Sequence, residues 1–143
     1  FYYLSNNRIK DINFVLEEAL SFDGNTGPYV QYTYARACSV LEKAGESEKG
    51  KLKITCEEES ALLKILCQYE EKVLAAIRDY EPSVIARFIL DIAAAFNRFY
   101  HNCQILSAED EDVRYTRIKI TEAVKYVLGS AFGLICLKKT EKI

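Results

Sequence analysis

The sequence contains no methionine or tryptophan, one histidine, two prolines and six glycines in 143 residues. With so few residues that interrupt regular structure, long helices or strands are favoured. The lone histidine, His101, has no cluster of metal-ligating residue types around it, so we expect no metal site. Because position 1 is phenylalanine, we expect a processed chain or a piece excised from a longer one.

Long apolar runs are also missing. No stretch approaches the roughly 18 to 20 apolar residues that span a bilayer, and charges at Arg8 and Lys10 come too early for a signal peptide. We therefore expect no membrane partner. The cysteines are too far apart in the sequence to indicate a zinc or redox pair, which predicts reduced, mostly buried thiols in a cytoplasmic protein. They are Cys38, Cys56, Cys67, Cys103 and Cys136.

The chain has no strong excess of charge of either sign. Its formal net charge of −2 argues against a general DNA- or RNA-coating protein, which is usually basic. The charge is unevenly divided, however, with a balance of −6 over residues 46–112 and +5 over residues 113–143. This basic segment could meet phosphates, or it could be a solvated helix face beside acidic neighbours. DNA is not an expected partner.

Half of the residues are apolar, which is enough for the core of one domain, and their spacing predicts an all-α bundle with short connections. A short helix is expected over residues 11–21 and an isolated strand over residues 1–4. We expect Thr55 and Glu58 to form a capping box, and Ser107 and Asp110 to form another N-terminal cap, for the last helix. The four longer helices are expected at about 29–44, 56–79, 83–103 and 109–131.

The helix expected from Tyr29 carries aromatic side chains on the face opposite its core stripe. That face holds Tyr29, Tyr32 and Arg36. An exposed tyrosine ring can stack on an unstacked base for roughly 1–3 kcal/mol, and an arginine can hold a phosphate or stack on a second base. The core stripe itself is expected to contain Val30, Tyr34, Ala37, Cys38 and Leu41.

The sequence leaves two further possibilities open for this face. Both tyrosines could pack against another helix or domain, or the face could dock a protein partner, since Tyr and Arg are enriched at interfaces. Near the end of the third long helix, Asn97 and Tyr100 are expected to hydrogen-bond to neighbouring elements, and His101 to cap the helix. No nucleophile has a convincing partner, so no catalytic residue is expected.

Residues 24–36, reading GNTGPYVQYTYAR, closely resemble a signature of arginyl-tRNA synthetases. In that family the signature lies where the catalytic domain meets the α-helical anticodon-binding (DALR) domain. The resemblance continues through residues 80–82, 96–100 and 114–134, and it covers essentially the whole chain. It implies that residues 1–22 end the catalytic portion and that residues 23–143 form a helical bundle of the class I anticodon-binding type.

The resemblance also implies a function. Family members are class I ligases that join arginine to its tRNA using ATP, and their helical domain reads the anticodon loop. This sequence lacks the family's ATP-binding HIGH and KMSKS elements, so we expect the chain to bind tRNA without a cofactor and without catalysis. The alternative is a helical protein-interaction module with a Tyr/Arg docking face. By motif position, the anticodon-loop contacts would be Tyr29, Tyr32, Arg36, Asn97, Tyr100 and Ile143.

Two departures from the family pattern stand out in the sequence. The terminal residue is Ile143, where the family usually ends in methionine. Tyr34 replaces a histidine that is more usual in the signature, and its place on the helical wheel predicts that it faces the core.

Overall fold

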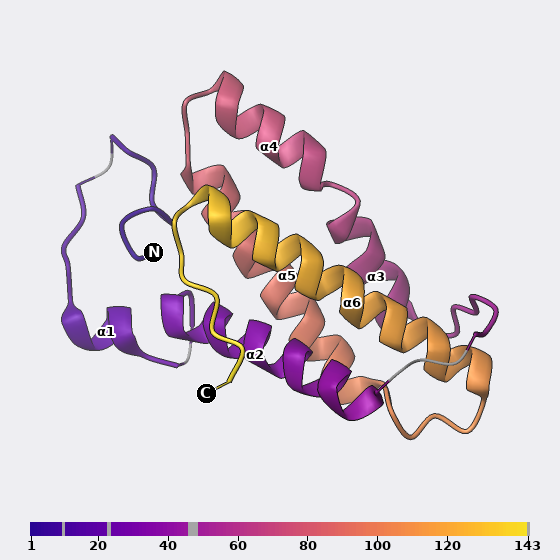
Figure 1. Ribbon diagram of the computed structural model, residues 1–143. Helices are drawn as coiled ribbons and strands as arrows, with labels where there is room; N and C mark the ends of the chain where they lie inside the picture. The colour runs from indigo at the N-terminus through magenta and orange to yellow at the C-terminus, as the bar shows by residue number, and fades with distance from the viewer. Residues whose placement is uncertain (10, 23, 46–48, 143) are drawn as a thin grey trace.

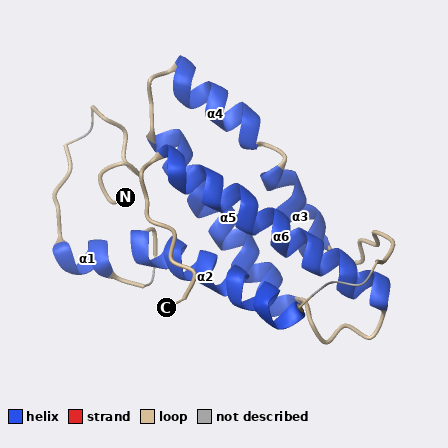
Figure 2. Cartoon of the chain, in the orientation of Figure 1, coloured by secondary structure: helices blue, strands red, loops and turns tan. Residues whose placement is uncertain are grey.

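The computed structural model describes residues 1–9, 11–22, 24–45 and 49–142. Regular structure in these residues is entirely helical, which confirms the all-α prediction (Figure 2). No helix within these ranges is both long enough and apolar enough to cross a membrane. The elements are α1 (Leu16–Leu20), α2 (Gly27–Ala44), α3 (Glu57–Leu66), α4 (Tyr69–Arg78), α5 (Ser83–Asn102) and α6 (Glu111–Leu134).

Helix α5 is the centre of the bundle and packs against α2, α3, α4 and α6 (Figure 1). Its apolar residues recur every three or four positions, which places them on one face. The prediction that this face is buried is confirmed, since its most exposed member is only 6 % exposed. The face consists of Ile85, Phe88, Ile92, Phe96, Phe99 and Cys103.

Helix α2 begins and ends as the sequence predicts. Thr26 Oγ1 accepts a hydrogen bond from the Tyr29 backbone N–H at 3.2 Å, and Pro28 lies in the first turn. Gly45 ends the helix with a φ of 65°, a left-handed conformation that glycine adopts without strain. Tyr34 is buried, as its place on the wheel predicts. At α6, Asp110 of the expected pair is the N-cap and accepts from two backbone N–H groups, whereas Ser107 lies before the helix and is not the cap.

The prediction of one helix over residues 56–79 is wrong. Helix α3 ends at Leu66, and α4 begins at Tyr69 after a short turn (Figure 1). Helix α3 packs against both α5 and α6, whereas α4 packs mainly on α5, where the Tyr69 ring lies 6.2 Å from that of Phe88. Ile77, in the last turn of α4, is 64 % exposed although its spacing matches that of the apolar positions before it.

The predictions for the N-terminal segment are also wrong in part. Residues 2–5 form turns, with the Ser5 backbone N–H donating to the Phe1 carbonyl at 2.9 Å, and no strand is present in the described ranges. The helix expected over residues 11–21 is limited to α1. Several large apolar side chains of this segment are exposed, among them Ile9, Leu16, Leu20 and Phe22.

All five cysteines are free thiols, but they are less buried than expected. Cys38 and Cys103 are buried, Cys56 is half-buried, and Cys67 and Cys136 are exposed. The expectation of reduced thiols is confirmed, but two of them lie close together in space. The start of α3 meets the end of α5, and this contact brings the sulfur atoms of Cys56 and Cys103 to 3.1 Å.

Candidate nucleic-acid interface

All described residues that the family motif assigns to the anticodon loop lie together on one side of the bundle. Helix α2 supplies Tyr29, Tyr32 and Arg36, and α5, packed beside it, supplies Asn97 and Tyr100. We call these residues the Tyr–Arg face. Ile143, the remaining residue of the set, lies outside the described residues.

Arg36 is the centre of the Tyr–Arg face. Its Nη1 donates a hydrogen bond to Asn97 Oδ1 at 2.6 Å. Its guanidinium carbon lies 4.8 Å from the ring centre of Tyr32 and 4.8 Å from that of Tyr100, which is within the range of cation–π attraction. No ion pair within the described ranges includes Arg36. The arginine is therefore held in place by neutral groups.

Asn97 holds this arrangement from the α5 side, and its hydrogen bonds to a neighbouring helix confirm the expectation. Its Nδ2 donates to the Tyr29 hydroxyl at 3.0 Å and to Thr33 Oγ1 at 3.2 Å. Both ends of the amide are satisfied, so Asn97 fixes the direction of the Arg36 side chain. Thr33 is fully buried, and the wheel did not indicate it because its role depends on a partner in another helix.

The two outer tyrosines of the face remain open to solvent. Tyr32 is 43 % exposed and Tyr100 is 39 % exposed. Instead of the hydrogen bond expected from its sequence position, the Tyr100 ring contacts Arg36 and meets His101 edge-on, with ring centres 5.7 Å apart. The face therefore presents two rings that each contact Arg36 and remain partly exposed, so that a ligand can stack on them.

A hollow of about 420 Å³ lies beside these rings. The C-terminal tail forms one of its edges, because Gln31 Nε2 donates to the Lys138 carbonyl at 2.9 Å and Lys142 Nζ lies 3.2 Å from Glu42 Oε1. Sequence reasoning missed these rim residues, since the tail is about a hundred positions from α2. The lining residues are Tyr32, Ala35, Arg36, Ser39, Glu42, Tyr100 and Lys142.

The basic segment expected over residues 113–143 is largely occupied by internal contacts where it forms α6. Arg114 Nε donates to the Leu106 carbonyl at 3.2 Å, Arg117 Nε to Glu59 at 2.6 Å, and Lys119 pairs with Glu122 at 2.8 Å. Of the two possibilities for this segment, the structure favours a helix face paired with acidic and carbonyl neighbours over a free phosphate-binding face.

The contact between Glu59 and Arg117 is the most buried ion pair of the described residues. The Glu59 side chain is 0 % exposed and that of Arg117 is 12 % exposed. Burial alone would raise the pKa of Glu59, but hydrogen bonds from the Thr55 and Cys56 backbone and from Arg117 outweigh it and keep the pKa below its ordinary value. The expected capping box of Thr55 and Glu58 is therefore wrong, since Cys56 is the N-cap of α3 and Glu59 completes the box. The role of Glu59 is structural.

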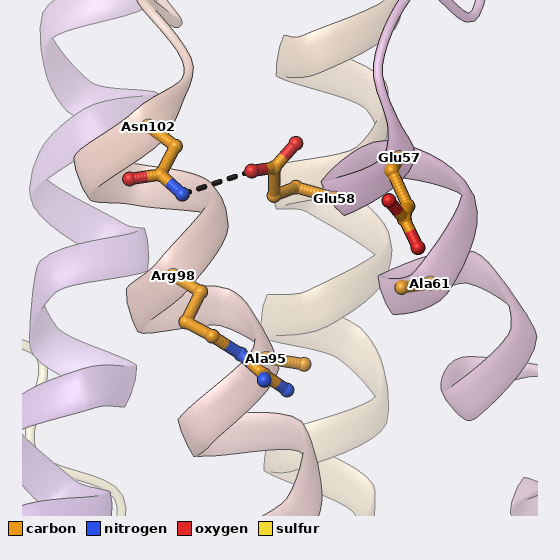
Figure 3. Close-up of a pocket in the computed structure, with 6 residues that line it drawn as sticks. All are labelled: Glu57, Glu58, Ala61, Ala95, Arg98 and Asn102. Atoms are coloured by element: carbon orange, nitrogen blue, oxygen red, sulfur yellow. Dashed lines mark hydrogen bonds between the residues drawn. The ribbon is translucent and has the colours of Figure 1, made fainter.

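A second hollow lies between α3 and α5 and is shown in Figure 3. Glu58 reaches across it and accepts a hydrogen bond from Asn102 Nδ2 at 2.8 Å. This bond is the main reason that the pKa of Glu58 is lowered, so the carboxylate stays ionised at neutral pH and is a poor general acid. Glu57 and Arg98 also line this hollow, and the arrangement does not indicate a catalytic pair.

Comparisons with known proteins show what the chain is similar to. The family described as the DALR anticodon binding domain matches residues 30–143. The arginine–tRNA ligase of Clostridium botulinum (strain Langeland) is 44 % identical over 100 % of this chain and 26 % of its own length. That of Alkaliphilus metalliredigens is 46 % identical over 98 % of this chain and 25 % of its own length.

Solved structures show the same fold. Arginyl-tRNA synthetase from Thermus thermophilus matches 94 % of this chain and 24 % of its own, with a TM-score of 0.86 and 37 % sequence identity. The Plasmodium falciparum enzyme, at 24 % identity and a TM-score of 0.86, supports the fold alone. The chain spans about a quarter of the length of these relatives. From the match over residues 30–143, the chain belongs to the DALR anticodon-binding domain family.

Proposed function

We propose that this chain is the anticodon-binding part of an arginine–tRNA ligase and that the Tyr–Arg face binds the anticodon loop of tRNA. One observation carries the proposal: two exposed tyrosine rings flank a guanidinium that no carboxylate neutralises within the described ranges. Aromatic rings bind unstacked bases, and a guanidinium binds phosphate or stacks on a base.

The residues of the face divide into two roles in this proposal. Tyr32 and Tyr100 stack on bases that are splayed out of the loop, and Arg36 contacts a phosphate or a second base. Tyr29 and Asn97 hold these groups in position through the hydrogen bonds described above. Ile143 remains a proposed contact by motif position, and it lies outside the described residues.

For the whole protein we propose ligation of arginine to tRNA with ATP, in the cytoplasm. Catalysis and ATP binding would belong to the part of the ligase that the matched relatives have beyond this chain. Residues 1–22 would form the junction with that catalytic portion, and residues 23–143 the anticodon-binding domain. The exposed apolar side chains before α2, such as Leu16 and Phe22, support this division, because a catalytic domain would cover them.

The alternative is that the Tyr–Arg face docks a protein partner. The salt dependence of binding affinity distinguishes the two functions. RNA binding releases counterions, so its affinity falls steeply as salt rises, whereas the affinity of a mainly apolar protein interface changes little.

The direct test is Tyr32→Ala. Loss of one stacking ring should weaken binding of an arginine-tRNA anticodon stem-loop by roughly 1–3 kcal/mol, measured by fluorescence anisotropy. Tyr126→Ala is the matched control, since this tyrosine is 76 % exposed on α6 and lies outside the face. In the full ligase, Tyr32→Ala should reduce charging at limiting tRNA and leave ATP and arginine binding intact. Equal RNA affinity in both variants would contradict the proposed role.

A further inference from the structure

We propose that Cys56 and Cys103 are a modification site, at which glutathione disulfide or a similar disulfide oxidant converts the two thiols to a reversible disulfide that joins α3 to α5. The observation is the distance of 3.1 Å between their sulfur atoms, although the residues are 47 positions apart in the sequence. Of the other cysteines, Cys67 and Cys136 are exposed and Cys38 is buried beside Tyr34.

The backbone at both residues suits a cross-link. Cys56 immediately precedes α3 and Cys103 immediately follows α5, and both have extended backbone angles. A disulfide places its sulfur atoms about 2.05 Å apart, so the pair must approach by about one ångström in total. Residues at helix ends can make this shift without breaking hydrogen bonds in a helix interior, and α3 and α5 already pack together.

Exposure sets the order of the reaction. Cys56 is half-buried and Cys103 is 6 % exposed, so the oxidant meets Cys56 first. The Cys56 thiolate attacks one sulfur of glutathione disulfide, and one glutathione thiolate leaves. The Cys103 thiolate then attacks the Cys56 sulfur and displaces the second glutathione. The protein loses two electrons and two protons, and glutathione disulfide gains them to give two glutathione thiols.

The first step removes one of the effects that disfavour the Cys103 thiolate. Burial raises the pKa of the Cys103 thiol to about 12, and the neighbouring Cys56 thiol contributes to this rise. When Cys56 is held in a mixed disulfide, it no longer carries an ionisable thiol, and that contribution disappears. The charge of Arg117 remains and acts in the opposite direction, favouring the Cys103 thiolate.

A metal ion is the competing occupant of this place. Cys56, Glu58 and Cys103 present ligand atoms within 4.8 Å of one another. However, Glu58 already accepts a hydrogen bond from Asn102 (Figure 3), and the positive Arg117 raises the cost of placing a cation beside the sulfurs. These features favour the disulfide.

The test treats the purified, reduced chain with glutathione disulfide. We expect a loss of the mass of two hydrogens, a Cys56–Cys103 peptide in a non-reducing digest, and full reversal by dithiothreitol. The link closes a long loop, so the melting temperature should rise by about 5 °C or more. Cys56→Ser should abolish the Cys56–Cys103 link and the rise in melting temperature. Cys67→Ser, the exposed control, should retain both.

Cys103→Ala is the second variant of the pair. Circular dichroism of Cys56→Ser and Cys103→Ala checks that the fold is kept. In Cys103→Ala, Cys56 should stop at a glutathione adduct. Adducts at Cys67 and Cys136 without an internal link in the wild-type chain would overturn the proposal. Stoichiometric zinc binding by the reduced chain that requires both Cys56 and Cys103 and blocks oxidation would overturn it as well.

Discussion

Arg36 and Arg117 are each held by a side chain from a neighbouring helix, but their partners differ in charge. Arg36 donates to the neutral amide of Asn97 at 2.6 Å, and Arg117 donates to the carboxylate of Glu59 at 2.6 Å. Arg36 is half-buried beside two exposed rings, whereas Arg117 is 12 % exposed and pairs with a fully buried group.

This contrast decides which positive charge is available to a ligand. A neutral partner fixes the geometry of a guanidinium without cancelling its charge, so Arg36 can still attract a phosphate. A carboxylate partner fixes and neutralises it, so Arg117 contributes to the stability of the bundle. The basic residues of the C-terminal segment cannot be counted as a phosphate-binding face by their number alone.

The largest predicted effect is on stability, when the buried ion pair between Glu59 and Arg117 is broken. Glu59→Ala leaves Arg117 without its carboxylate, and we expect the free energy of unfolding to fall by about 3–5 kcal/mol, measured by urea denaturation. The matched control is Glu57→Ala, an exposed residue in the same helical turn, which should change stability by less than about 0.5 kcal/mol. Under conditions where Glu59→Ala is folded, its RNA affinity should equal that of the wild type. A large loss of RNA affinity would show that the two arginines do not have separate roles.

The wheel could predict the Tyr–Arg face because the positions of Tyr32 and Arg36 depend only on helical periodicity. It could not predict that Arg117 pairs with Glu59, since the two residues are 58 positions apart and meet through packing. The break between α3 and α4 was missed for a similar reason. Both halves of the expected helix have apolar positions at helical spacing, and only the packing of each half against different neighbours distinguishes two helices from one.

The second prediction concerns a substitution that places a carboxylate beside Arg36, as Glu59 lies beside Arg117. Asn97→Asp is nearly isosteric, so the fold should be retained, but the new carboxylate would neutralise Arg36 and repel phosphate. We expect stem-loop affinity to fall by roughly 1–3 kcal/mol, measured by anisotropy at low salt. Asp91→Asn, on an exposed part of α5, is a control for charge change and should leave RNA affinity within about 0.5 kcal/mol of the wild type. Unchanged affinity in Asn97→Asp would mean that the charge of Arg36 is not used.

A smaller effect concerns pH. The pKa of Glu59 is lowered in the folded state, so its contribution to stability is present above the unfolded value and is lost as pH falls through the folded value. The free energy of unfolding should therefore decrease between about pH 5 and pH 2. This decrease should be shallower in Glu59→Gln than in the wild type. Denaturation curves at several pH values test this, and identical slopes for the two proteins would exclude Glu59 as a source of the acid sensitivity.

The most direct test of separate roles for the two arginines is the salt dependence of stem-loop binding by Arg36→Gln and Arg117→Gln. Glutamine keeps a hydrogen-bond donor but carries no charge. If Arg36 contacts one phosphate, the slope of log affinity against log salt should become shallower by about 0.7 in Arg36→Gln. In Arg117→Gln, measured where the protein is folded, the slope should stay at the wild-type value. Equal slopes in Arg36→Gln and the wild type, or a loss of slope in Arg117→Gln alone, would contradict these roles.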